Sequence, residues 1–175
     1  MQSKQSTGND QLDWMLNHWC ALRANRVMPT RREFDPTEVP PKTLPNLMIV
    51  EIQEEKRFLY RLHGTAHVEA VGWDLTGSYL DELPERGGYR DYIIGIYERL
   101  VQERAPLFTE STIHWKDYVT RSTQRLMMPF SNDGHTVHHV LSAQVFEFVR
   151  CDDRAKFNLT DFEGFGETQR YVLHV

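Results

Sequence analysis

The chain contains few cysteines and no long apolar run. Its 175 residues include only Cys20 and Cys151, too few for a disulfide framework or a thiolate zinc site. No stretch approaches the roughly 18 apolar residues that a membrane span needs. The opening residues, MQSKQSTGNDQLDW, lack the basic segment and apolar block of a secretory signal. We therefore expect a cytoplasmic location and no membrane partner.

An excess of positive charge is also missing. The formal net charge is -5 at pH 7 and the calculated pI is about 5.9, which disfavours binding to phosphate backbones. The one basic cluster, Arg23 to Arg32, is followed at once by Glu33, Asp35 and Glu38. We expect a solvated or internally paired surface there, and no nucleic-acid partner.

Motifs of catalysis and metal binding are not evident. The sequence has no GxSxG elbow and no GxxxxGK phosphate loop, and Asp74 and Asp81 are typical of turns or caps on short helices. His63 and His67 are spaced like two metal ligands on a helix, but Gly64 interrupts them and no third ligand follows at a suitable spacing. We assign no catalytic residue and no metal site, and expect no enzyme.

The apolar pattern at the N-terminus predicts a helix. Asn9 or Asp10 could cap a helix that runs to about Asn25. One stripe of this helix is apolar and needs a partner surface, either the chain's own core or a second copy. It comprises Leu12, Met15, Leu16, Trp19 and Cys20. The helix is therefore a candidate for homodimer formation.

The rest of the chain predicts two strands, short helices, one long helix and three strands. We place the strands at 47–52, 57–64, 107–115, 118–130 and 136–148, and the long helix at 89–104. This order indicates an α+β fold: a five-stranded antiparallel sheet with helices on one face, plus the N-terminal helix. We divide the chain into a helix with a proline-rich wrapping segment (1–46), the main domain (47–150) and a tail (151–175) to which we assign no structure.

Three segments resemble the PAS domain, and within it a stand-alone bacterial family of alphaproteobacterial type. They are MPTRREFDPTEVPPKTLPNL at 28–47, YRLHGTAHVEAVGWDLTGSYLDEL at 60–83 and MMPFSNDG at 127–134. The resemblance covers roughly residues 12–149. It implies a PAS-like fold and a sensory or protein-interaction role, usually without catalysis.

The resemblance fixes no cofactor, so the cofactor stays unknown. Some PAS domains hold haem through a histidine on the long helix, but residues 89–104 contain none. Flavin photochemistry in related light-sensing domains needs a cysteine in a short helical motif, and neither cysteine of this chain lies in one.

A hollow between the sheet and the long helix is the candidate ligand site. Alternation along the second strand would turn one set of its side chains toward that helix. The predicted lining is Phe58, Tyr60, Leu62, His67, Tyr92, Ile93, Ile96, Tyr97, Leu126 and Met128. The same side chains could instead fill the core.

The sequence is compatible with three functions. The first is a PAS sensor that binds a small molecule or a protein partner and signals through another protein, because the sequence shows no output domain. The second is a constitutive interaction module without a ligand. The third is a small-molecule enzyme on a cup-shaped α+β fold, which would need a buried carboxylate or histidine of perturbed acidity in the hollow.

Overall fold

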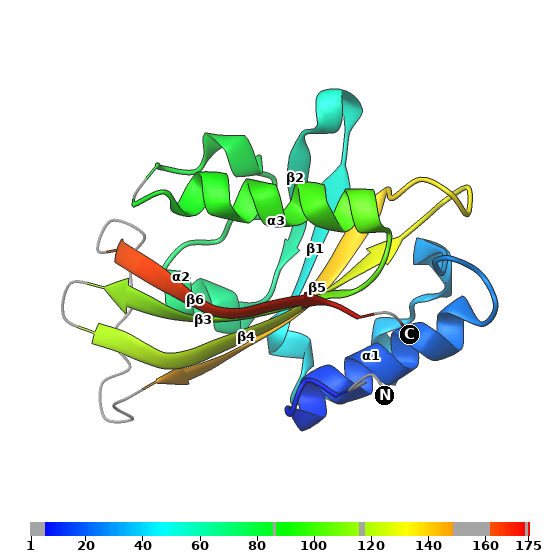
Figure 1. Cartoon of the computed structure of the whole chain (residues 1–175), viewed down its shortest axis with the longest axis horizontal. Helices are drawn as coiled ribbons and strands as arrows, with labels where there is room; N and C mark the ends of the chain where they lie inside the picture. The colour runs from blue at the N-terminus through cyan, green and yellow to red at the C-terminus, as the bar shows by residue number, and fades with distance from the viewer. Residues whose placement is uncertain (1–5, 86, 116–117, 149–161, 174) are drawn as a thin grey trace.

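An antiparallel sheet organises the molecule (Figure 1). The computed structural model describes residues 6–85, 87–115, 118–148, 162–173 and 175. Six strands lie in the order β2-β1-β5-β4-β3-β6. Their bounds are β1 Leu47–Ile52, β2 Phe58–His63, β3 Leu107–Trp115, β4 Tyr118–Phe130, β5 His139–Phe148 and β6 Phe162–Val172. The α-helices are α1 Asp10–Arg23, α2 Thr65–Val71 and α3 Tyr89–Glu103, and α3 and α1 cover opposite faces of the sheet.

Helix α1 packs its apolar stripe on the sheet of its own chain. The Asn9 side chain accepts hydrogen bonds from the amides of Gln11 and Leu12 and so caps the helix. Trp19 is fully buried, and its indole N–H donates to the carbonyl of Pro129 on β4 at 2.9 Å. The partner surface that the stripe needed is therefore the chain's own core.

The α+β fold with an antiparallel sheet is confirmed, but the described residues form six strands rather than the expected five, because part of the tail to which we assigned no structure forms a strand. Residues 162–172 form β6, which pairs antiparallel with β3 from Leu107 opposite Val172 to Trp115 opposite Phe162. An unpaired β3 would leave a row of open backbone groups at the edge of the sheet, and β6 satisfies them. Gly164 and Gly166 weaken the strand pattern in the sequence.

A bulge in β2 reverses which side chains face the core. Ile49 of β1 lies opposite Leu62, whereas Val50 lies opposite Tyr60, so Arg61 is one extra residue on β2. As a result Leu62 is 41% exposed and His63 is buried. The predicted inward position of Leu62 was therefore wrong, because strict alternation fails at the extra residue.

Candidate functional site

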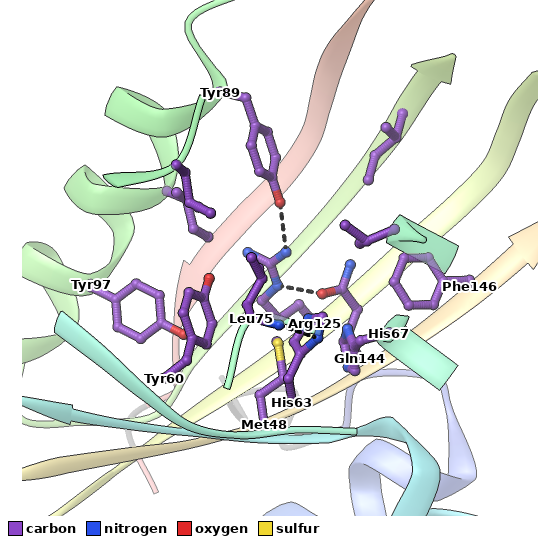
Figure 2. Close-up of a pocket in the computed structure, with 14 residues that line it drawn as sticks. Met48, Tyr60, His63, His67, Leu75, Tyr89, Tyr97, Arg125, Gln144 and Phe146 are labelled. Atoms are coloured by element: carbon purple, nitrogen blue, oxygen red, sulfur yellow. Dashed lines mark hydrogen bonds between the residues drawn. The ribbon is translucent and has the colours of Figure 1, made fainter. Parts of the chain in front are cut away.

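A small cavity lies between α3, α2 and the sheet (Figure 2). Its free volume is about 50 Å³. Most of its wall is apolar, with a few polar groups that converge on it. The lining residues are Met48, Tyr60, His63, His67, Val71, Leu75, Leu83, Tyr89, Ile93, Tyr97, Ile113, Arg125, Gln144 and Phe146.

Arg125 is the permanently charged residue among the described residues that line this cavity. It lies in β4 directly opposite Gln144 of β5 and is only 7% exposed. Its Nε atom donates to Oε1 of Gln144 at 2.8 Å, and its Nη2 atom donates to the hydroxyl of Tyr89 on α3 at 3.1 Å. Both bonds are drawn in Figure 2. Arg125 thus connects the sheet to the first residue of the helix above it.

No carboxylate among the described residues forms an ion pair with Arg125. Both of its hydrogen-bond partners there are neutral oxygens, an amide and a phenol. Burying a cation without a counterion costs on the order of several kcal/mol in lost hydration. The cavity is therefore electropositive.

The close approach of α2 to the sheet depends on Gly64. Its amide donates to the carbonyl of Leu47 at 2.9 Å. A Cβ atom at this position would collide with the carbonyl oxygens of Pro45 and Leu47, so only glycine fits without a backbone shift. This contact places His67, in the first turn of α2, against the cavity.

The two histidines are neutral members of the wall. His67 Nε2 lies 3.0 Å from the carbonyl oxygen of Asn46, so this nitrogen carries the proton. His63 Nδ1 accepts from the Leu75 amide at 3.4 Å, so its proton is on Nε2. Burial lowers the pKa of His63 and lowers that of His67 to about 3, despite the opposing effect of the Asn46 bond. Neither ring adds positive charge at neutral pH.

These histidines come together without completing a metal site. Their ring centroids are 5.4 Å apart, closer than the interrupted spacing in the sequence suggested. Over the ranges that the structure covers, however, no three His, Cys, Asp or Glu side chains are grouped so that they could hold an ion.

Two buried tyrosines contribute hydroxyl groups. Burial raises the pKa of Tyr60 well above its usual value and that of Tyr97 to about 12. Both phenols therefore stay protonated and can donate hydrogen bonds. Tyr60 also packs edge-on against His63, with ring centroids 5.8 Å apart.

The ten residues predicted from the sequence fall into three groups. Tyr60, His67, Ile93 and Tyr97 line the cavity; their role in binding a ligand remains a prediction. Phe58 and Ile96 are buried beside it without lining it. The third group lies elsewhere: exposed Leu62, half-buried Tyr92, and Leu126 and Met128.

The predicted position of Leu126 and Met128 was wrong. Side chains alternate along β4, and Arg125 faces the cavity, so Leu126 and Met128 point to the face covered by α1. Tyr92 donates its hydroxyl to Glu167 of β6 at 2.7 Å and so faces the edge of the sheet. The prediction took the apolar residues of β4 as lining, but they lie on the face of the sheet opposite to the cavity.

Sequence reasoning missed Arg125, Gln144, Tyr89 and His63. One signal was present: Gln144 is a polar residue within a mostly apolar stretch of β5, VLSAQVF, whereas Arg125 follows the polar run TRSTQ of β4 and nothing in the local sequence marks it. A long polar residue inside a buried strand is typical of a functional position.

The architecture is that of an α+β domain with a small cavity between its antiparallel sheet and a covering helix. The family description "PAS domain" matches residues 9–144, most of the chain. The chain belongs to the PAS domain family, which confirms the resemblance drawn from its three motifs. No match was found among curated proteins or among solved structures.

Family membership supports a sensory or interaction role, and PAS domains are in general regulatory rather than enzymatic. None of the helices in the described part of the chain is both long and apolar enough to cross a membrane. The bacterial, alphaproteobacterial-type origin stays a prediction.

Proposed function

We propose that the protein is a sensory PAS module that binds a small molecule in the cavity beneath α3 and signals through a protein partner. One observation carries this proposal: Arg125 holds two hydrogen bonds at the cavity wall and leaves further N–H groups without an acceptor among the described residues. Apolar walls with a few convergent polar groups are the usual make-up of ligand sites.

A route from the cavity to the surface supports signalling. Arg125 contacts Tyr89, and the Tyr89 ring packs against Phe165 of β6 with ring centroids 5.7 Å apart. The Tyr92 ring packs on the same Phe165 with ring centroids 4.2 Å apart, and its hydroxyl donates a hydrogen bond to Glu167. A ligand that draws Arg125 away from Tyr89 would loosen this cluster and shift the population of β6 states.

We propose that the protein partner binds the edge of the sheet at β6. The opposite edge, β2, is already covered, because the Tyr60 amide donates to Ser78 and the Gly77 amide donates to Tyr60. A homodimer through α1 is also proposed, but through the face of the helix that its own sheet leaves uncovered. A cytoplasmic location fits such a relay and is part of the proposal.

Native mass spectrometry of the purified protein tests this function. A mass excess that disappears on denaturation identifies a retained small molecule, and the intact mass reports dimer formation. Hydrogen exchange at residues 162–172 then tests the route, because ligand should change their protection. If ligand binding left the hydrogen exchange of β6 unchanged, the proposed route from the cavity to β6 would be contradicted.

A constitutive interaction module is the second candidate. The free volume of about 50 Å³ supports it, because pockets for drug-sized ligands span about 300–1,000 Å³. A bare chain in native spectra, together with a partner that binds equally well to a variant whose cavity is filled by Val71→Phe, would favour this candidate.

A further inference from the structure

The cavity beneath α3 has an unbalanced charge of one sign. Among the described residues that line it, Arg125 is the only permanently charged side chain, and His63 and His67 are neutral. Within the described ranges the guanidinium bonds only to the Gln144 amide and the Tyr89 hydroxyl. A single buried positive charge is balanced best by a ligand that carries a single negative charge.

The arrangement of donors is suited to a carboxylate. Arg125 has five N–H groups, of which the two described bonds use two. A guanidinium holds a carboxylate through two parallel hydrogen bonds. The proton-bearing Nε2 of His63 and the hydroxyl of Tyr60 are further donors at the same wall, and no acceptor for either is found among the described residues.

The remaining space is small and apolar. A water molecule needs about 10–15 Å³ of such volume, so about 50 Å³ accommodates a ligand of only a few heavy atoms. Leu75, Ile93 and Ile113 form apolar wall beside the polar groups. A short alkyl group would replace water there favourably, whereas a compact anion such as phosphate has no apolar part to use it.

We propose that the ligand of this cavity is a small aliphatic monocarboxylate, held by Arg125 through its carboxylate and by Leu75 and Ile93 through its alkyl chain. This inference rests on the proposed sensory function and names the chemical class of its ligand. The carboxylate supplies the counterion that Arg125 lacks, and it competes with Tyr89 for the guanidinium. Binding is thereby coupled to the contact between Tyr89 and β6.

The test is a methyl-detected NMR titration of the dialysed full chain with propionate and butyrate. Saturable shifts of the Leu75 and Ile93 methyl signals are expected. Propionamide has nearly the shape of propionate without its charge, and it should bind roughly 10- to 100-fold more weakly because it lacks a charge-assisted bond. Inorganic phosphate should leave these methyl signals unchanged.

Matched variants locate the binding group. Arg125→Gln should abolish the shifts, and Arg125→Lys should weaken binding about tenfold, because lysine keeps the charge but not the planar pair of donors. Arg99→Gln on the exposed face of α3 removes the same charge outside the cavity and should leave the affinity unchanged. Should Arg125→Gln fail to fold, the comparison of propionate with propionamide on the unaltered chain still decides.

Three results would overturn the inference: equal affinity for propionamide, shifts of these methyl signals with phosphate, or no shift with any carboxylate. Native mass spectrometry separates this failure from failure of the sensory function. A retained molecule without a carboxyl group would reject the monocarboxylate and leave the sensory cavity in place. No retained molecule and no titration response would reject both.

Discussion

Trp19 and Pro129 join α1 to β4 through a hydrogen bond of 2.9 Å from the indole N–H to the backbone carbonyl. Replacing Trp19 by Phe leaves that buried carbonyl unsatisfied and opens a small void. We expect a loss of about 1–3 kcal/mol in the free energy of unfolding, measured by urea denaturation. Trp73 is 50% exposed, so Trp73→Phe should change stability by less than about 0.5 kcal/mol. Equal effects of the two variants would mean that α1 does not dock on the sheet as described.

Substitutions of Gly64 and Gly95 by alanine make a second matched comparison of stability. Gly64→Ala forces a Cβ into the carbonyls of Pro45 and Leu47, and we expect a loss of about 2 kcal/mol or more. Gly95 lies within α3 with open space around its Cα, so Gly95→Ala should stabilise the protein by about 0.5–1 kcal/mol. Thermal unfolding followed by circular dichroism reports both changes. If Gly64→Ala left the stability unchanged, the close approach of Gly64 to the carbonyls of Pro45 and Leu47 would be disproved.

The bulge in β2 predicts unequal costs for one substitution made at two leucines. Leu62→Lys places a charge on an exposed side chain and should change stability by less than about 0.5 kcal/mol. Leu59 is buried on the same strand, and Leu59→Lys should cost about 3 kcal/mol or more. Chemical denaturation measures both. If Leu62→Lys proves the more harmful, Arg61 is not the extra residue.

The buried His67 predicts a loss of stability in acid. Its pKa lies near 3 in the folded protein, below the ordinary value of 6.5, because burial disfavours the charged ring. The unfolded chain therefore binds the extra proton first, and His67 contributes fully only above about pH 6.5. Below that value stability should fall by up to about 1.4 kcal/mol per pH unit.

His67→Asn removes this titration while keeping a donor for the Asn46 carbonyl. The free energy of unfolding, measured by urea denaturation from pH 7.5 down to pH 4.5, should decline less steeply in the variant. Parallel pH profiles of the two proteins would show that the ring is not held neutral.

Phe165 predicts how strongly β6 is attached to the rest of the molecule. Its ring contacts Tyr89 and Tyr92, and Phe165→Ala removes both contacts, so we expect a loss of about 1–2 kcal/mol. Amide exchange at residues 162–172 should accelerate more than exchange in β1. Uniform acceleration across the sheet would argue against a separately mobile edge.

Much of the fold could be predicted from the sequence because the signals were local. The N-cap at Asn9 and the apolar spacing predicted the end of α1 to within two residues, and SNDG predicted the hairpin that joins β4 to β5. Strand β6 was missed because Gly164 and Gly166 interrupt its pattern, and it exists through pairing with the distant β3.

The candidate site was harder to predict. A single extra residue, Arg61, moved Leu62 outward and His63 inward, and no local pattern marks such a bulge. From Arg125 to Phe130 on β4, the side chains of both faces are buried. Only the tertiary structure shows that Arg125 belongs to the face beneath α3, since the helices that cover the two faces come from distant parts of the chain.

The placement of β1 has a consequence for synthesis of the chain. Leu47 of β1 lies opposite Ala143 of β5, so the centre of the sheet closes only after β5 has left the ribosome. Until then the apolar run LMIV has only β2 as a neighbour in the sheet. Such long-range pairing makes folding slow, on the order of milliseconds to seconds. Until β5 is available, the unpaired edge of β1 is therefore a site at which the nascent chain is prone to aggregate.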